Sequence, residues 1–337
     1  GFYEPVFTAL REPDIIGQIT RMNDFLERHL GFSPRGIWLA ERVWDPVLPR
    51  LIADTGLSYT LLDSTHLLHA GIPPEQIHGY YMTERNGSPL AIFPINRQMR
   101  YSIPFKPPQE TIAYLRYMAG ADDPIAVTSG DNGEKFGLWP GTAKSVYEDG
   151  WLEQFFTALE ENSDMIQMAT FSEYLDLASA TGSIYLPSLS YDELMEWALP
   201  ADAVIRFEDM LNTLEDSRMK DQYRSFIHGG CWSNFLVKYP EANQMHKKML
   251  GVSKRLEQLR PVCPPEKQEA LSEAQQELYQ AQCNSAYWHG LFGGVYQNYL
   301  RHAVYEHLIN AENILDKAVP LEPNCEALDF MCDGTRM

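Results

Sequence analysis

The chain has 337 residues, of which 45% are hydrophobic, so it can bury a sizeable core as one large domain with a smaller one, or as two ordinary domains. Its 27 Lys and Arg are outnumbered by 46 Asp and Glu, which gives a formal charge of −19. A field of that sign repels phosphate backbones and anionic lipid surfaces, so neither nucleic acid nor a membrane is an expected partner.

The cysteines are odd in number and widely scattered, and none has zinc-like spacing with histidines. We therefore expect reduced thiols in a cytoplasmic protein, with no metal and no cofactor. No apolar run approaches the roughly 18 residues of a membrane span, and no signal-peptide pattern opens the chain. The cysteines are Cys231, Cys263, Cys283, Cys325 and Cys332.

The first two-thirds of the chain alternate between helical and strand patterns. Apolar residues recur at helical spacing from Ile15 to Leu30, with Pro13 near the start and Gly31 just past the end. Short apolar runs between helices predict a parallel sheet, with the chemistry at the C-terminal ends of its strands. The predicted strands are 36–40, 59–62, 90–94 and 124–128, and the predicted helices are 13–30, 47–54 and one around 112–118.

From about Leu199 helical patterns take over. They cover 203–214, 232–259 and 265–282, and Pro261, Pro264 and Pro265 mark a turn between two of them. We expect a helical domain that follows the α/β domain, with no strand of comparable quality.

The first motif whose side chains could take part in catalysis is GIWLAERVWDP, residues 36–46. Glu41 falls just past a predicted strand, between Trp38 and Trp44. A carboxylate held there is placed like a glycosidase nucleophile, beside rings on which sugars stack. The alternative is a structural Glu paired with Arg42 or another base, which the pattern alone favours.

The second motif is SGDNGEKFGLWPGT, residues 129–142, which follows the strand predicted to end at Thr128. It offers Asp131, Glu134, Lys135 and Trp139 in a glycine-rich loop, where the backbone can come close to a ligand. The Lys lacks the spacing of a phosphate-binding loop. A polar surface turn is an equally good interpretation.

The third motif is NSAYWHGLFGGVYQNYLRH, residues 284–302. Tyr287, Trp288 and His289 precede glycines within an otherwise helical region. Each such glycine costs about 1 kcal/mol relative to Ala in a helix, which indicates a packing or functional reason. Close helix packing is the alternative explanation.

Together these stretches resemble glycoside hydrolase family 57. GFYEP, GIWLAERVW, DNGEKFGLWPGT and AYWHGLFGG match conserved stretches of that family in order and spacing. The connecting segments SLSYDELMEWALP, GGCWSNFLVKYPEANQMHKKML and LRHAVYEHLINAE resemble its 4-α-glucanotransferase branch. The likeness covers nearly the whole chain.

The resemblance implies an α/β fold, a distorted (β/α)7 barrel followed by an α-helical bundle. Residues 1–198 would form the barrel without its N-terminal strand, since the His-rich stretch that opens the family's barrel is missing. Residues 199–318 would form the helical domain that carries the AYWHG motif, and 319–337 would be a linker towards an absent β-rich domain.

The resemblance also implies a retaining double displacement, in which a Glu attacks the anomeric carbon and an Asp protonates the leaving oxygen. The Glu maps onto Glu41, and the two carboxyls of a retaining pair lie roughly 5–5.5 Å apart. The position of the Asp is Asn132 here, and the adjacent Asp131 would be a weak substitute. Since losing a general acid typically costs about 10²–10⁴-fold, we expect an inactive or weakened enzyme.

Substrate-binding roles follow from the same resemblance. Trp38, Trp139 and Trp288 would stack on sugar rings, with core packing as the alternative for each. A further departure is Ser285, where the family member compared carries Asp, which bears on acceptor preference. The other substrate-binding candidates are Glu4, Glu134, Lys135, Tyr287 and His289.

The leading function is transfer between α-1,4-glucan or maltooligosaccharide chains. Hydrolysis as in the family's α-amylases is the close alternative, and a branching enzyme fits less well because its acid loop differs. Asn132 also fits a non-catalytic glucan-binding protein. A metal-dependent deacetylase lacks its Asp/His/His set. A homodimer is a candidate assembly.

Overall fold

The computed structural model describes residues 1–120, 125–318 and 330. Helix α1 (Glu12–Leu30) has Pro13 in its first turn, and Gly31 follows it in the left-handed region with φ 62°. The helix buries Ile15, Gln18 and Ile19. This confirms the helix predicted from the apolar spacing.

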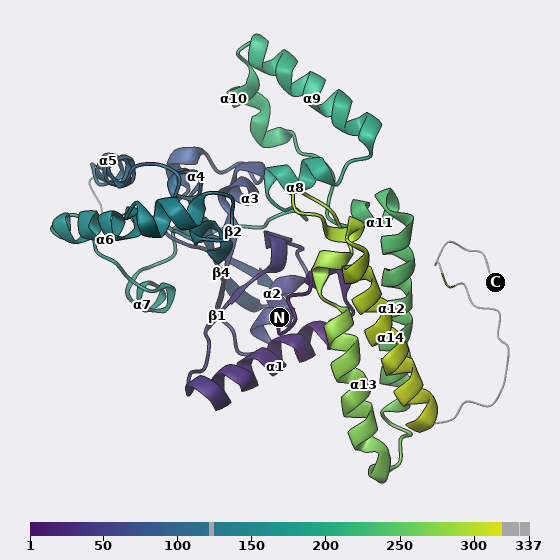
Figure 1. Ribbon diagram of the computed structural model, residues 1–337. Helices are drawn as coiled ribbons and strands as arrows, with labels where there is room; N and C mark the ends of the chain where they lie inside the picture. Colours follow the sequence, from purple (N-terminus) through teal and green to yellow (C-terminus); the bar gives the residue numbers. More distant parts are fainter. Residues whose placement is uncertain (121–124, 319–329, 331–337) are drawn as a thin grey trace.

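A five-stranded sheet lies at the centre of the first part, in the order β1-β2-β4-β3-β5 (Figure 1). β1, β2 and β4 are parallel, with Ile37 opposite Thr60 and Thr60 opposite Ile92. β3 is antiparallel to β4, and β5 is parallel to β3. The strands are β1 (Gly36–Trp38), β2 (Tyr59–Asp63), β3 (Tyr81–Arg85), β4 (Ser88–Ile95) and β5 (Gly182–Ser183).

The predicted strands at β1, β2 and β4 are parallel as expected, but the sheet as a whole is mixed, because β3, which was not predicted, is antiparallel to β4. The cause is a tight turn at Asn86 and Gly87, with φ 55° and 82°, which returns the chain directly from β3 to β4. Asn-Gly is the pair that such a hairpin turn prefers, because both central residues need positive φ.

The strand predicted at 124–128 begins in residues outside the described ranges. Of its described part, Thr128 forms only an isolated parallel bridge with Ile95. The backbone N–H of Asn96 also donates to Thr128 O at 2.9 Å. The segment thus runs parallel to β4 beside its end, as predicted, but without a regular ladder.

Helices surround this sheet, and its core is built from Leu48, Leu51, Leu62, Leu90 and Ile92, all essentially inaccessible to solvent. The helices of this part are α2 (Leu48–Ala53), α3 (Ser64–His69), α4 (Arg97–Ser102), α5 (Pro108–Met118), α6 (Trp151–Glu161), α7 (Phe171–Leu177) and α8 (Asp192–Trp197). Short turns of 3-10 or π helix are η1 (Phe7–Ala9), η2 (Ala40–Arg42), η3 (Pro74–Gln76), η4 (Gly133–Phe136) and η5 (Lys144–Glu148).

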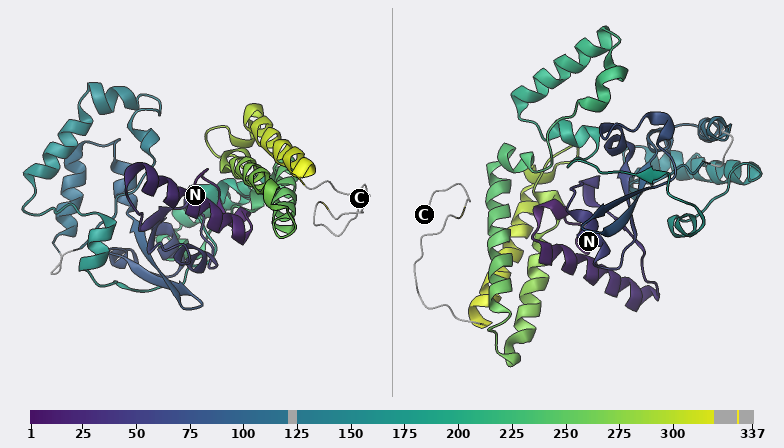
Figure 2. Two further views of the ribbon diagram at one scale, coloured as in Figure 1. Left: turned by 90° about the horizontal axis from the view of Figure 1, so that it is seen from below. Right: turned by 180° about the vertical axis from the view of Figure 1, so that it is seen from behind.

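After residue 199 the described residues are helical. α12, α13 and α14 lie side by side, and α9 and α10 project away from them (Figures 1 and 2). The helices are α9 (Ala201–Asp216), α10 (Lys220–Tyr223), α11 (Asn234–Lys238), α12 (Pro240–Leu259), α13 (Gln268–Ala281) and α14 (Asn298–Ala318). The short 3-10 helices are η6 (Arg224–Phe226), η7 (Pro265–Lys267), η8 (Asn284–Ala286) and η9 (Gly294–Tyr296).

The two parts share a core. Ala40 and Val43, which flank the Glu41 turn, are buried in the same cluster as Leu278 and Leu308 of the helical part. Gln18 of α1 is fully buried, and its side-chain amide donates to Tyr279 O at 3.0 Å. The end of β1 is therefore fixed against the helices as well as the sheet.

Within the described residues no helix is both long and apolar enough to cross a membrane. The predicted linker at 319–337 lies, apart from residue 330, outside the described residues. The predicted domain boundary near residue 199 stays a prediction, since buried residues from both sides of it form one cluster.

Candidate active site

Glu41 sits in a strained turn directly after β1. Its φ is 52° and that of Arg42 is 49°, within η2. Left-handed backbone in a residue other than Gly costs on the order of 1–3 kcal/mol and persists only where neighbours impose it. Here Ser190 Oγ donates to Glu41 O at 2.6 Å, and His66 Nε2 lies 3.0 Å from Arg42 O.

The Glu41 carboxylate has a specific hydrogen-bond donor. Tyr191 Oη donates to Glu41 Oε2 at 2.6 Å. Two guanidiniums lie over the Tyr191 ring, with Arg42 Cζ 4.3 Å and Arg100 Cζ 5.0 Å from its centroid. Burial, and then the charge of Glu41, raises the pKa of Tyr191, so the hydroxyl keeps its proton and acts as donor.

The segment that carries Ser190 and Tyr191 is fastened to the chain after Glu41. Trp44 N donates to Leu189 O at 2.8 Å, and Leu189 N donates to Trp44 O at 3.2 Å. The Trp44 indole N–H donates to Leu186 O at 3.3 Å, and only 1% of this residue is exposed. Trp44 is thus a structural anchor, whereas Trp38 on the other side of Glu41 is only partly buried.

A buried charge network lies beneath this turn. Arg100 Nη1 donates to Asp63 Oδ2 at 2.8 Å, and both side chains are largely buried. Burial opposes ionisation of Asp63, but Arg100 and Arg42 outweigh it and hold the pKa of Asp63 below its usual value. The Arg42 guanidinium also lies 5.5 Å from the centroid of the Trp38 ring, so it is near both the Trp38 and the Tyr191 rings.

The predicted acid loop, 129–142, directly follows Thr128, which forms the isolated bridge with Ile95 of β4. Asn132 is exposed and precedes η4. Asp131 accepts from Asn132 N at 2.9 Å through Oδ1 and forms an ion pair with Lys135 through Oδ2. Lys135 is buried, and its Nζ also donates to Arg100 O at 2.6 Å. Asp131 is therefore committed to its own loop.

Glu4 comes from the N-terminal turn and has φ 52°. Its carbonyl accepts from Asn284 Nδ2 at 2.6 Å, which ties the turn to the third motif. Desolvation, and then the negative charges of Glu41 and Glu134, raise the pKa of Glu4. Carboxylates from three separate segments thus lie close enough to interact.

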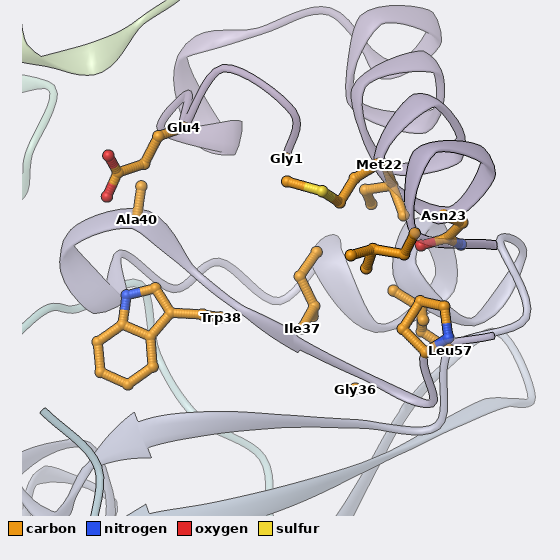
Figure 3. A pocket seen from close by; sticks show the side chains of 12 residues that line it. Gly1, Glu4, Met22, Asn23, Gly36, Ile37, Trp38, Ala40 and Leu57 are labelled. Atoms are coloured by element: carbon orange, nitrogen blue, oxygen red, sulfur yellow. The ribbon is translucent and has the colours of Figure 1, made fainter. Parts of the chain in front are cut away.

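Figure 3 shows where Glu4 and Trp38 lie relative to the end of β1. The Glu4 carboxylate and the Trp38 ring lie on either side of Ala40, at one end of a hollow of about 200 Å³. The rest of this hollow is lined by apolar side chains such as Met22, Ile37 and Leu57. Only its Glu4 and Trp38 end therefore belongs to the site.

Residues of the third motif differ in their surroundings. Tyr287 is buried in the helical core, and its hydroxyl donates to Ala281 O at 2.8 Å, so its ring has no open face. Trp288 is partly buried, donates through Nε1 to Asn284 Oδ1 at 2.7 Å and stacks on Trp197. His289 Nδ1 hydrogen-bonds to the carbonyl of Gly293.

Trp139, the remaining candidate, lies at the end of the acid loop. Its ring stacks on Phe105 at 6.0 Å and contacts Phe292 at 5.6 Å between centroids. Glu134, four residues after Gly130, is exposed, and its carbonyl accepts from Trp139 N at 3.1 Å.

Sequence reasoning missed several residues around Glu41. Ser190 and Tyr191 bond to Glu41 from a distant segment, and nothing in their local patterns marks them. His66 hydrogen-bonds to the carbonyl of Arg42, and Arg100 lies over the Tyr191 ring. The available signal was the segment SLSYDEL, which carries Ser190 and Tyr191 and was noted only for its family likeness. Within the described residues, no group of three or more His, Cys, Asp or Glu could hold a metal ion.

The fold and this cluster define a class: an α/β protein with acidic side chains and tryptophans gathered where a sheet strand ends. The family model of glycosyl hydrolase family 57 matches residues 1–187, more than half of the chain. A second model, the middle domain of alpha-amylase/4-alpha-glucanotransferase, matches residues 230–315. The chain belongs to glycosyl hydrolase family 57.

Full-length relatives agree with this assignment. The chain is 42% identical over 334 residues to alpha-amylase 1 of Dictyoglomus thermophilum and 41% identical over 334 residues to the 4-alpha-glucanotransferase of Thermococcus litoralis. Each match covers 99% of this chain, but only 47% and 48% of those proteins. The crystal structure of the Thermococcus litoralis enzyme superimposes with a TM-score of 0.89 over 100% of this chain and 50% of that one. The chain thus spans about half the length of these relatives.

Proposed function

We propose that the protein acts on α-1,4-glucans as a retaining 4-α-glucanotransferase, with Glu41 as its nucleophile. The observation that carries this proposal is the Glu41 carboxylate, held in a left-handed turn at a strand end and hydrogen-bonded by Tyr191. Neighbours that impose a strained backbone on a carboxylate fix its direction, which attack on an anomeric carbon requires.

In the proposed mechanism, Glu41 attacks the anomeric carbon of a bound glucan while the leaving oxygen takes up a proton. A glycosyl ester on Glu41 results, and the hydroxyl of a second glucan then displaces it with retention. Asn132 would take the position of the acid and base, whose carboxyl in a retaining pair lies roughly 5–5.5 Å from that of the nucleophile. An amide supplies no acid proton, so protonation of the leaving oxygen is impaired in the chain with Asn132.

Asp131 is a poor substitute in this scheme. Its carboxylate accepts from Lys135 and from Asn132 N, so both oxygens are already engaged within the loop. We therefore assign Asp131 a structural role beside the site.

The remaining candidates receive binding roles in the proposal. Trp38, Trp139 and Trp288 are all partly buried and would each offer a ring face to a sugar, although Trp288 also stacks on Trp197. Glu4 and Glu134 would bind sugar hydroxyls, and Lys135 and His289 would hold loop geometry. The sheet and its helices would belong to the family's (β/α)7 barrel, with α12, α13 and α14 as its helical bundle.

The proposal is tested by comparing two substrates that differ in their need for an acid. Fluoride leaves without protonation, so the first displacement on α-maltotriosyl fluoride, measured as the initial burst of fluoride release, should be nearly as fast in full-length protein with Asn132 as in its Asn132→Asp variant. Maltotriose should react about 10²–10⁴-fold more slowly with Asn132 than with Asp. Glu41→Gln should consume neither substrate. Turnover that survives Glu41→Gln would show that the nucleophile is assigned wrongly.

The products separate the alternative functions. A transferase makes both longer and shorter oligosaccharides from maltotriose, whereas a hydrolase makes only shorter ones. Relatives named alpha-amylase and 4-alpha-glucanotransferase match about equally well, so the products decide between these two. If the Asn132→Asp variant and the original both bind maltotriose but transform neither substrate, the protein is a glucan-binding protein.

A further inference from the structure

A second hollow opens beside the turn between β3 and β4. Its volume is about 440 Å³, which falls in the range of about 300–1,000 Å³ that is typical of ligand sites. It is lined by residues within 44–49, 83–86 and 185–187. None of these described residues is among those assigned to the nucleophile, the acid loop or the third motif.

The turn lies at the end of β4 that is remote from the acid loop. Ser88 lies opposite Arg85 at this end. Ile95, at the other end, bridges to Thr128, which the acid loop follows. The eight residues of β4 span roughly 23 Å at about 3.3 Å per residue. A ligand on the turn is therefore well separated from Asn132.

Side-chain hydrogen bonds join two of the segments that wall the hollow. Trp44 is 1% exposed, and its indole N–H donates to Leu186 O at 3.3 Å. Ser188 Oγ donates to Asp45 Oδ2 at 2.7 Å. Because these bonds fasten the segment before α2 to the segment after β5, the hollow is formed without a ligand.

The hollow also presents an exposed ring that a carboxylate holds in place. Tyr185 is 69% exposed, and its hydroxyl donates to Glu84 Oε1 at 2.8 Å. Glu84 Oε2 accepts from Gly87 N at 2.6 Å, so one carboxylate positions both the turn and the ring. The hydrogen bond from Gly87, and then the one from Tyr185, lower the pKa of Glu84, so this carboxyl is charged at neutral pH.

The charges around the hollow favour a neutral ligand. Arg85 is exposed and follows Glu84 directly, so the cation and the anion that line the hollow offset each other. A phosphate or a carboxylate would meet Glu84 as well as Arg85, whereas sugar hydroxyls can donate to the first and accept from the second. The Tyr185 ring adds a flat apolar face of the kind that sugar rings contact.

We propose that this hollow is a second glucan-binding site, separate from the site of reaction, a role that rests on the proposed function. A glucose unit would lie on the Tyr185 ring, and its hydroxyls would bond to Glu84 and Arg85. A long chain held there would keep its other segments at a high effective concentration near Glu41. The site would therefore matter for polymers such as glycogen more than for a short donor such as α-maltotriosyl fluoride.

The test uses full-length protein with Asn132, which binds glucan without rapid turnover. Electrophoresis in gels that contain glycogen gives the Kd from the retardation of the protein. We expect Tyr185→Ala to raise this Kd about tenfold, and Tyr185→Phe, which keeps the ring, to retain most of the affinity. The fluoride burst from α-maltotriosyl fluoride should be unchanged in both variants, because it reports on Glu41. Tyr117→Ala removes a ring that is 80% accessible on α5, and should change neither measurement.

Each other outcome overturns the second site in a distinguishable way. If Tyr185→Ala binds glycogen as tightly as the unchanged protein, the hollow is not a glucan site, although the proposed function stands. If Tyr185→Ala lowers the fluoride burst together with the glycogen affinity, Tyr185 acts through the Glu41 site and the separate site is overturned. If the unchanged protein releases fluoride but glycogen does not retard it, the second site alone fails. If it does neither, the proposed function fails and the second site with it.

Discussion

Tyr191 Oη donates a 2.6 Å hydrogen bond to Glu41 Oε2, across 150 residues of sequence. Ser190 Oγ donates to the carbonyl of Glu41 as well, so one short segment holds both the carboxylate and the backbone of the turn. That segment leads directly into α8, and Tyr191 is buried in the same cluster as Leu278 and Leu308 of the helical part. The site is thus defined jointly by the sheet and by the chain that enters the helices.

Tyr191→Phe should slow turnover while leaving the fold intact. Arg42 and Arg100 would still lie over the ring, but Glu41 would lose a hydrogen bond to a charged group, worth about 1.5–3 kcal/mol. We expect kcat on maltotriosyl fluoride to fall about tenfold or more. Tyr80→Phe is the control, because its hydroxyl donates to Ala178 O instead. Equal rates in both variants would contradict a role for the Tyr191 hydroxyl.

Asp63→Asn should destabilise the protein, because it leaves Arg100 buried without its partner. Breaking such a pair costs about 3–5 kcal/mol. The pKa of Asp63 is lowered in the folded state, so its contribution is complete above the ordinary value of 3.8 and is lost as the pH falls below it. Urea unfolding should give the Asp63→Asn variant a much smaller free energy of unfolding than the unchanged protein at pH 7. This difference should narrow below about pH 4. A difference independent of pH would contradict this.

Glu4→Gln should stabilise the protein at neutral pH. The pKa of Glu4 is raised from 4.5 in the folded state, so the folded protein loses stability as the pH rises from that value through the raised pKa. Gln carries no charge, so the variant does not lose stability as the pH rises. Thermal unfolding should give the variant the higher midpoint at pH 7 and nearly equal midpoints at pH 4. A variant that is less stable at pH 7 would show that the Glu4 charge has a favourable partner.

Asn132 should deamidate slowly, because it is exposed and the Gly133 that follows leaves its backbone N–H free to attack the side-chain amide. Aged protein should gain Asp or isoaspartate at this position and, with it, some activity on maltotriose. Peptide mass spectrometry and product chromatography on the same samples measure both. Conversion without any gain in activity would argue against Asn132 as the silenced acid.

Much of the fold follows from local sequence. The helix from Glu12 to Leu30 and the strands β1, β2 and β4 match their predicted positions, because apolar spacing and flanking Pro or Gly determine them locally. The predicted helix 232–259 is interrupted at Tyr239, where Pro240 starts α12. Proline supplies no N–H within a helix, so this break was readable from the sequence.

The antiparallel pairing of β3 with β4 could also have been predicted from the sequence. Asn86-Gly87 is a strong hairpin signal, but β3 before it contains Thr83, Glu84 and Arg85, and its polarity concealed the strand. The short β5 has only Gly182 and Ser183, and its pairing with β3 depends on contacts far along the chain. Local patterns carry no information on such pairings.

For the site, the sequence predicted which segments take part, but not which side chains contact one another. Burial, and then the negative charges of Glu41 and Glu134, raise the pKa of Glu4, which relates three of the predicted segments to one another. Tyr287 illustrates the limit, because its neighbours in the motif gave no sign that its ring is buried. The roles of these residues, the cytoplasmic location and the homodimer stay predictions.

The central claim is that Glu41 forms the covalent bond to the glucan, and trapping tests it directly. A 5-fluoro-α-maltosyl fluoride needs no acid to react, and its ring fluorine slows the second displacement, so the glycosyl enzyme accumulates even with Asn132. Peptide mass spectrometry should then locate the added sugar on Glu41, and Glu41→Gln should remain unlabelled. A label on Glu4, Asp131 or Glu134 would contradict the account, as would consumption of the reagent with no label on the protein.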